Sequence, residues 1–314
     1  MIYTIYQIIR TARPRQWLKN GSIFAAPVLA GVLFADNKLY LLIQAFTSFC
    51  ILSSGAYFLN DILDAPRDRQ HPIKKNRPIA SGALSPKTAW FFVFIFILSP
   101  IIYSFIFLGT YFTLSMIIYI VIQLCYSLYF RNIIILDSLV VASGFVIRVF
   151  AGGFASNTSI SSWLTLTTIG ISLLMAFGKR RSEKTILAKL STPNFQPDTR
   201  ATLKHYPDNL LDSMITMFAS YTVVTYSLFA FQTSPKGVSK VLSDFLPSIL
   251  KGPKWMMLTI PLVIYGVARY LYIIYEKGEA ESPERVLLSD KSILFTVILW
   301  GAMVMGIIYL VPLG

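Results

Sequence analysis

Five long stretches of this chain contain no Asp, Glu, Lys or Arg, and they limit the fold more than any other feature of the sequence. They cover residues 39–60, 88–130, 149–178, 213–235 and 292–314. About 20 apolar residues in a helix cross the hydrocarbon core of a bilayer. Charged residues make up only 14% of the chain, against about 25% in soluble domains. The sequence therefore predicts an all-α, polytopic membrane protein.

We expect about nine transmembrane helices in a single domain over residues 1–314. The stretch 88–130 is long enough for two spans, with a turn near 108–110, and 132–178 also accommodates two. The apolar residues 1–9 are followed by positive charges, which predicts a short interfacial helix rather than a cleaved signal peptide. The expected span cores are 21–35, 40–60, 88–107, 111–130, 134–153, 161–178, 214–232, 256–275 and 292–312.

Positive charge predicts the orientation of these spans. Most of the 28 Lys and Arg residues lie in the N-terminal segment and in the loops that follow spans 2, 4, 6 and 8. Such segments face the cytoplasm. We therefore expect a cytoplasmic (inner) membrane protein with its N-terminus inside and its C-terminus outside. The net charge of +13 is then mainly a topology signal, and nucleic-acid binding is not needed to explain it.

Three carboxylates gather where the second span is expected to meet the cytoplasm. Asp61, Asp64 and Asp68 are spaced i, i+3, i+7, which places them on one face of a helix. Mg²⁺ takes oxygen ligands and usually binds through one or two carboxylates plus substrate phosphates. Asn60 adds a carbonyl oxygen. The spacing favours a magnesium site at this rim.

The residues after the acidic cluster are basic. Lys74 and Arg77 are suited to the phosphates that a metal ion would bridge. The alternative is a solvated helix end in which neighbouring arginines pair with the acids. Pro66 predicts a kink that moves Asp68 relative to the other two aspartates. His71 is either structural or directly involved in the chemistry, and the sequence leaves both open.

The stretch from residue 60, NDILDAPRDRQHPIKKNRPIASG, resembles the first aspartate-rich motif of the UbiA superfamily of intramembrane prenyltransferases, NDxxDxxxD followed by RPxxxG. Further blocks are similar to the decaprenyl-phosphate phosphoribosyltransferase branch of that superfamily. They are RPRQWLKN (13–20), YSLYFRN (126–132), LDSLVVASGFVIRVFAGG (136–153) and FGKRR (177–181).

The resemblance implies a UbiA-like helical bundle and a Mg²⁺-dependent transfer. The 5-phosphoribosyl group of phosphoribosyl pyrophosphate would pass to a polyprenyl phosphate, and diphosphate would leave. Catalysis would rest on Asp61, Asp64 and Asp68, which would hold Mg²⁺ together with Asn60. The cytoplasmic loops 61–87 and 179–213 would cap the active site.

Other polar residues at the same expected rim become candidates for phosphate or substrate binding. They are Lys19, Asn20, Lys74, Arg77, Tyr126, Arg131, Asp137, Lys179 and Arg180.

The loop after the sixth span separates branches of the superfamily. Aromatic prenyltransferases carry a second acidic motif there, whereas this chain has FGKRRSEK. A sugar donor with an additional phosphate would require more cations. The topology rule is the alternative explanation for the basic residues, and Asp208 and Asp212 could form a displaced acidic site.

Two ionisable residues fall within the fifth expected span. Asp137 and Arg148 are costly there and are expected to face the bundle interior. Eleven positions separate them, so they share a face but lie about 16 Å apart along the axis. Each therefore needs a partner on another helix, either in a structural network or in the site.

Two other functions remain open at this point. One is prenyl transfer to an aromatic acceptor such as 4-hydroxybenzoate. The other is transport, although the sequence shows no internal repeat and its acidic cluster lies at the rim rather than at mid-membrane. The expected partners are the two phosphate substrates and the lipid bilayer, and the oligomeric state is open.

Overall fold

The computed structural model describes residues 2–70, 74–190, 206–233, 254–277 and 282–310, and every regular element in these ranges is a helix. The α-helices are α1 (Ile2–Ala12), α2 (Ala25–Leu29), α3 (Lys38–Asp68), α4 (Pro86–Phe107), α5 (Thr110–Leu128), α6 (Leu136–Ala155), α7 (Ser162–Leu190), α9 (Asp208–Thr233), α11 (Ile260–Tyr272), α12 (Pro283–Ser289) and α13 (Lys291–Met305). Short 3₁₀ and π segments are η1 (Pro14–Phe24), η2 (Lys74–Asn76), η3 (Phe130–Asn132), η5 (Trp255–Thr259), η6 (Ile273–Lys277) and η7 (Gly306–Leu310).

Seven described helices are long and apolar enough to cross a membrane, which confirms a multi-pass, all-α architecture. The expected count of nine stays a prediction. The helix α7 has 29 residues and packs against α6 and α9, but it falls outside this group of seven. The seven spans are Lys38–Asp68, Pro86–Phe107, Thr110–Leu128, Leu136–Ala155, Asp208–Thr233, Trp255–Lys277 and Lys291–Leu310.

The first expected span is wrong as a continuous α-helix over 21–35. The chain there consists of η1 followed by the five-residue α2. Asn20, Gly21 and Ser22 have low helix propensity, and Gly31 adopts a left-handed φ of 72°, which ends the segment. This broken segment packs against α3 and α6.

Two helices extend further than the sequence indicates. The helix α3 continues through Pro66 to Asp68, and α7 continues to Leu190. Residues 61–68 and 179–190, expected within cap loops, therefore belong to helix ends. The acidic cluster is consequently held on a rigid element.

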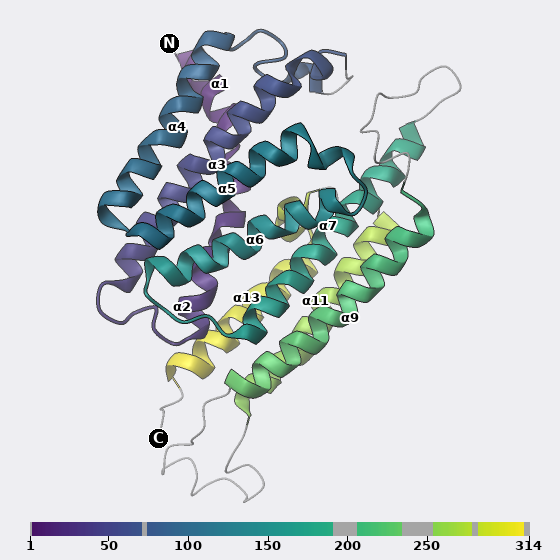
Figure 1. Ribbon diagram of the computed structural model, residues 1–314. Helices are drawn as coiled ribbons and strands as arrows, with labels where there is room; N and C mark the ends of the chain where they lie inside the picture. The colour runs from purple at the N-terminus through teal and green to yellow at the C-terminus, as the bar shows by residue number, and fades with distance from the viewer. Residues whose placement is uncertain (1, 71–73, 191–205, 234–253, 278–281, 311–314) are drawn as a thin grey trace, which may run out of the picture.

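The helices differ in how much of their apolar surface faces outward. More than half of the apolar window of α3 is buried, but less than a quarter of the windows of α4 and α13. In Figure 1, α4 and α9 lie at opposite sides of the bundle, with α6 and α7 between them. Exposed side chains of α4 include Phe91, Phe94, Leu98 and Phe105. Such a surface suits lipid rather than water.

The segment η1 approaches α6 closely at Gly152. A Cβ atom on Gly152 would lie 1.8 Å from the carbonyl oxygen of Ile23 and 2.7 Å from its carbonyl carbon. Backbone atoms cannot yield as a flexible side chain can. The glycine therefore sets the position of η1, which carries several polar residues of the site.

We predict that Gly152→Ala destabilises the protein by at least about 1–3 kcal/mol, because the added methyl group overpacks a backbone contact. The matched control is Gly301→Ala in α13, where a Cβ atom meets nothing within 4 Å. The control should be neutral or slightly stabilising, since alanine favours helix. Thermal unfolding in detergent measures both, and equal Tm values would contradict the close approach.

Candidate active site

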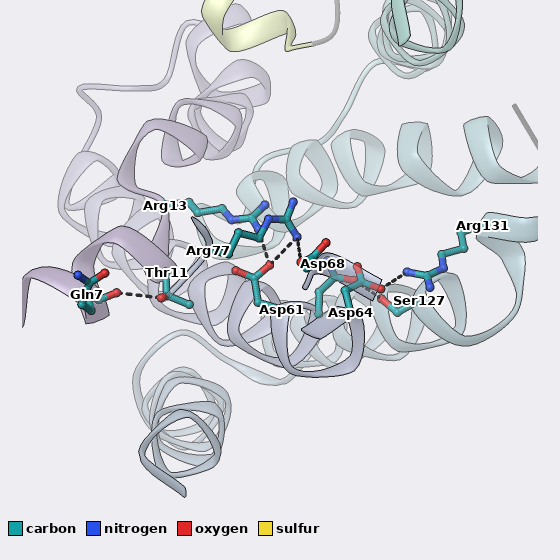
Figure 2. A network of polar contacts seen from close by, with 10 residues as sticks. Gln7, Thr11, Arg13, Asp61, Asp64, Asp68, Arg77, Ser127 and Arg131 are labelled. Atoms are coloured by element: carbon teal, nitrogen blue, oxygen red, sulfur yellow. Dashed lines mark hydrogen bonds and ion pairs between the residues drawn. The ribbon is translucent and has the colours of Figure 1, made fainter. Parts of the chain in front are cut away.

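Asp61 and Asp68 lie on one face of the C-terminal end of α3 and share a guanidinium group (Figure 2). Nη1 of Arg77 lies 3.1 Å from a carboxylate oxygen of Asp61 and 2.7 Å from one of Asp68. A second guanidinium, that of Arg13, contacts Asp61 at 2.5 Å. Asp61 is 2% exposed and Asp68 is 5% exposed. The two acids are thus buried, adjacent and neutralised by arginines from the segments on either side.

Arg13 occupies an unusual backbone conformation. It is the residue between α1 and η1, and its φ is 54°. A left-handed conformation at a non-glycine residue costs of order 1 kcal/mol or more. The Arg13 guanidinium also lies over the ring of Tyr57, 5.2 Å from the centroid. The ring and the carboxylate of Asp61 together fix this cation beside the acidic cluster.

Asp64 and Asn60 face a different neighbour. Nη1 of Arg131, in η3, lies 2.5 Å from a carboxylate oxygen of Asp64. The hydroxyl of Ser127, on α5, donates to the amide oxygen of Asn60 at 3.2 Å. Figure 2 shows Arg131 and Ser127 approaching α3 from the side opposite Arg13. The i, i+3, i+7 spacing therefore brings Asp61 and Asp68 together, while Asp64 joins α3 to η3.

The carboxylate pair has the donor chemistry that Mg²⁺ prefers. Oxygens of Asp61 and Asp68 lie within 3.1 and 2.7 Å of the same Arg77 nitrogen, so an ion in its place could contact both. Within the described ranges, no group of three or more His, Cys, Asp or Glu side chains could hold a metal ion. The arrangement fits an ion bound by one or two carboxylates and completed by ligand phosphates, rather than an ion in an all-protein cage.

Asn20 and Arg148 form a buried network deeper in the bundle. The amide oxygen of Asn20 accepts from Nε of Arg148 at 2.7 Å. Arg148 also donates to the hydroxyl of Tyr119 at 3.0 Å and to the carbonyl of Gly144 at 2.7 Å. Arg148 thus does not pair with Asp137, and its side-chain partners, Asn20 in η1 and Tyr119 in α5, lie on other elements.

Lys19 contacts an acid that the sequence did not single out. Its ammonium lies 3.3 Å from a carboxylate oxygen of Glu284 in α12, and the side-chain amide of Gln16 donates to the other carboxylate oxygen. Burial alone would raise the pKa of Glu284, but the charge of Lys19 and the hydrogen bonds hold that pKa below its ordinary value. Glu284 is thus ionised at neutral pH.

Asp137 and Arg180 form a second buried network with Tyr126. Nε of Arg180 contacts Asp137 at 2.5 Å, and its remaining nitrogens contact Glu183 at 2.7 Å and the hydroxyl of Tyr126 at 3.0 Å. Arg180 is only 1% exposed. The guanidinium therefore joins α5, α6 and α7, and this geometry favours a positioning role over direct phosphate binding.

Tyr206 completes that network from the segment before α9. Its hydroxyl donates to Asp137 at 2.6 Å and accepts from the backbone N–H of Ile135 at 2.6 Å. Burial and the hydrogen bond to Asp137 raise the pKa of Tyr206 to about 12, so the hydroxyl stays a donor. The start of α9 is thereby tied to the start of α6.

The remaining candidates lie at the periphery of these networks. Lys179 is 3.8 Å from Glu183, and Lys74 lies in η2 close to Arg77 in the sequence. Asp208 and Asp212 pair with the basic side chains of α7: Lys184 is 2.9 Å from Asp208, and Arg181 is 2.9 Å from Asp212. Both acids thus make ion pairs with basic residues of α7, and the displaced acidic site stays a prediction. His71 lies outside the described residues.

Sequence reasoning missed Glu284, Gln16 and Tyr206. Gln16 stands between Arg13 and Lys19 in a block already singled out, so its position was a usable signal. Glu284 and Tyr206 come from segments with no motif, and only the fold brings them to η1 and α6. Arg13 opens the same block but was not assigned to the site.

Comparison with known proteins gives three kinds of similarity. A family model described as the UbiA prenyltransferase family matches residues 24–299. A protein of Corynebacterium glutamicum named decaprenyl-phosphate phosphoribosyltransferase is 30% identical over 98% of this chain and 88% of its own length. A protein of the same name from Mycolicibacterium smegmatis is 30% identical over 96% and 92% of the two chains.

Solved structures show the same fold. A UbiA homologue from Archaeoglobus fulgidus, described as bound to GPP and Mg²⁺, has a TM-score of 0.66 at 17% identity and covers 96% of this chain and 99% of its own. At this identity the likeness concerns the fold alone.

We predict that Arg180→Met lowers the free energy of unfolding by about 3–5 kcal/mol, because it leaves the buried Asp137 without its counter-ion. Arg181→Met is the matched control on the same helix, since it removes a partly exposed ion pair with Asp212. That control should cost less than about 1 kcal/mol. Thermal unfolding in detergent compares them, and an equal loss in both variants would rule out the buried role of Arg180.

Proposed function

Since this chain belongs to the UbiA prenyltransferase family, we propose that it transfers the 5-phosphoribosyl group of phosphoribosyl pyrophosphate to a polyprenyl phosphate. The observation that carries the proposal is the 30% identity, over nearly the whole chain, to two relatives named decaprenyl-phosphate phosphoribosyltransferase. The proposal is also supported by the two arginine side chains, Arg13 and Arg77, that surround the buried carboxylates of Asp61 and Asp68. Both substrates are rich in phosphate, and each needs positively charged partners inside the bundle.

The proposed reaction is a substitution at the anomeric carbon of the ribose. The bond between this carbon and the diphosphate oxygen breaks, and the electron pair leaves with diphosphate. A phosphate oxygen of the lipid attacks the carbon and forms a phosphodiester. No oxidant, reductant or water is needed, so the protein must position two anions and stabilise the charge that develops on the leaving group.

Asp61 and Asp68 would hold Mg²⁺ together with oxygens of the diphosphate. When bound, Mg²⁺ supplies charge neutralisation for the departing diphosphate. Arg77 and Arg13, which contact these carboxylates here, would then turn their guanidinium groups to phosphate oxygens, for which Arg is well suited. Asp64 would keep Arg131 in place at the edge of the site.

The active site would face the cytoplasm, where the soluble sugar donor is available. The acidic cluster lies at the end of α3 remote from Lys38, and the ion pairs from Arg13, Arg77 and Arg131 gather at the same end. This end also carries most of the basic loops that the positive-inside rule assigns to the cytoplasm. The proposed location is the cytoplasmic membrane, with the N-terminus inside.

We expect purified protein to form a labelled lipid from labelled phosphoribosyl pyrophosphate and a polyprenyl phosphate in the presence of Mg²⁺. The sugar donor should also raise the Tm of the detergent-solubilised protein by binding the folded state, whereas ribose 5-phosphate should raise it less. Prenylation of 4-hydroxybenzoate from geranyl diphosphate, with no labelled lipid from the sugar donor, would favour the aromatic prenyltransferase alternative and overturn this proposal.

We predict that Asp61→Asn lowers the transfer rate about 100-fold or more, because it removes an anionic oxygen from the charge-stabilising site. Excess EDTA should have a similar effect on the wild type. Asp36→Asn is the matched control, since Asp36 is exposed and precedes the far end of α3. Full activity of Asp61→Asn, or full activity in EDTA, would exclude the carboxylate–metal arrangement.

A further inference from the structure

Glu284 projects from the short helix α12 into the polar interior beside η1. It is 8% exposed. One carboxylate oxygen accepts from the side-chain amide of Gln16, and the other lies 3.3 Å from the ammonium of Lys19. A protein carboxylate therefore occupies a position bounded by a cation and an amide donor.

The hydrogen bonds of the Glu284 carboxylate are incomplete in this position. The carboxylate oxygen of Glu284 nearest Lys19 is buried and accepts no well-aligned hydrogen bond within the described residues. A buried carboxylate oxygen normally accepts several hydrogen bonds. The position is thus shaped for an anion but incompletely filled by this one.

The surroundings contain more positive charge than Glu284 neutralises. Arg148 lies close to this position, because its Nε donates at 2.7 Å to the amide oxygen of Asn20, the residue after Lys19. The hydrogen bonds that Arg148 makes within the described residues go to an amide oxygen, a carbonyl and a hydroxyl, all neutral. Arg148 itself is 4% exposed. A buried cation without a counter-ion is costly, so a ligand with more than one negative charge would be favoured here.

The position that the Glu284 carboxylate occupies is separate from the pair formed by Asp61 and Asp68. Asn20, next to Lys19, contacts Cys50 and Ser53 of α3 at 3.2 and 3.3 Å. These residues precede Asp61 by two to three helical turns, which is about 12–16 Å along α3. An anion on Lys19 would therefore lie apart from the aspartate pair, toward the interior of the bundle.

We propose that Lys19, Gln16 and Arg148 form a second anion site, which binds a phosphomonoester dianion, and that the Glu284 carboxylate occupies this site until the ligand displaces it. The inference rests on the proposed function because both proposed substrates carry phosphate beyond the leaving diphosphate. The ligand is either the phosphate of the lipid acceptor or the 5-phosphate of the sugar donor.

Displacement of Glu284 would also make the site selective. A phosphodiester head group of a bulk phospholipid carries one negative charge, as Glu284 does. Its binding in place of the Glu284 carboxylate would therefore yield little net free energy. A phosphomonoester carries close to two charges at neutral pH and replaces one carboxylate with a net gain. Membrane phospholipids would thus be excluded although they surround the protein in large excess.

The test measures binding to detergent-solubilised protein with EDTA present, so that the aspartate pair holds no divalent ion. The probes are farnesyl phosphate, ribose 5-phosphate and phosphatidylglycerol, and the readout is the dissociation constant from ligand-dependent Tm shifts. Glu284→Gln keeps the shape of the side chain but removes its charge. We expect it to bind one or both phosphomonoesters about tenfold more tightly than wild type, the equivalent of one charge-assisted hydrogen bond.

Glu276→Gln is the matched control, because Glu276 is exposed in η6 at the same end of the bundle. It should bind like wild type, and Lys19→Met added to Glu284→Gln should abolish the gain. Tighter binding of farnesyl phosphate would assign the site to the lipid acceptor, and tighter binding of ribose 5-phosphate would assign it to the donor. No gain over Glu276→Gln, or an equal gain for phosphatidylglycerol, would overturn the proposal.

Two further measurements keep the result interpretable. If Glu284→Gln does not fold, Glu284→Asp retracts the carboxylate by one methylene and should give a smaller gain, whereas weaker binding would overturn the site. The transfer assay tests the proposed function separately. If the wild type forms labelled lipid but Glu284→Gln binds no more tightly, only the anion-site proposal is overturned. If Glu284→Gln binds more tightly but the wild type forms no labelled lipid, only the proposed transferase function is overturned.

Discussion

Arginine guanidinium groups link different helices at the end of the bundle where Asp61, Asp64 and Asp68 lie, and hold that end together. Arg131 joins η3 to α3 through Asp64, and Arg180 joins α7 to α6 through Asp137. Buried carboxylates without such partners cost several kcal/mol each. Any shift of one helix relative to its neighbour would separate a pair of charges in a medium that solvates them poorly. The lipid-facing surfaces of these helices are uniformly apolar and do not fix how one helix lies against another. The ion pairs therefore set the relative positions of the helices.

The same constraint explains how a site for highly charged substrates can be stable without them. Arg13 and Arg77 neutralise Asp61 and Asp68. In the proposed reaction the arginines would exchange these carboxylates for phosphates while a metal ion takes the carboxylates. The number of charges that lack a partner would stay small in both states. Binding would then require exchange of partners rather than creation of new buried charge.

The sequence predicted the helical class, most span boundaries and the acidic cluster, because these depend on local composition and on spacing within one helix. It placed Asp61, Asp64 and Asp68 on one face, but it could not show that Asp64 turns to Arg131. It assigned Arg180 to substrate binding because its basic neighbours suggested phosphate. The partners of Arg180 come from α5, α6 and its own helix, and such long-range pairings leave no mark in one sequence. The break in the first span was missed because apolar content does not distinguish an α-helix from a 3₁₀ segment.

That 3₁₀ segment gives η1 a property that an α-helix would lack. With three residues per turn, positions three apart stand directly above one another, about 6 Å apart along the axis. Gln16 and Lys19, three positions apart within η1, both contact the carboxylate of Glu284. In an α-helix the same two positions would be rotated by about 60° relative to each other, and their ends would diverge. The tighter winding of η1 thus lets an amide donor and a cation reach one carboxylate from consecutive turns.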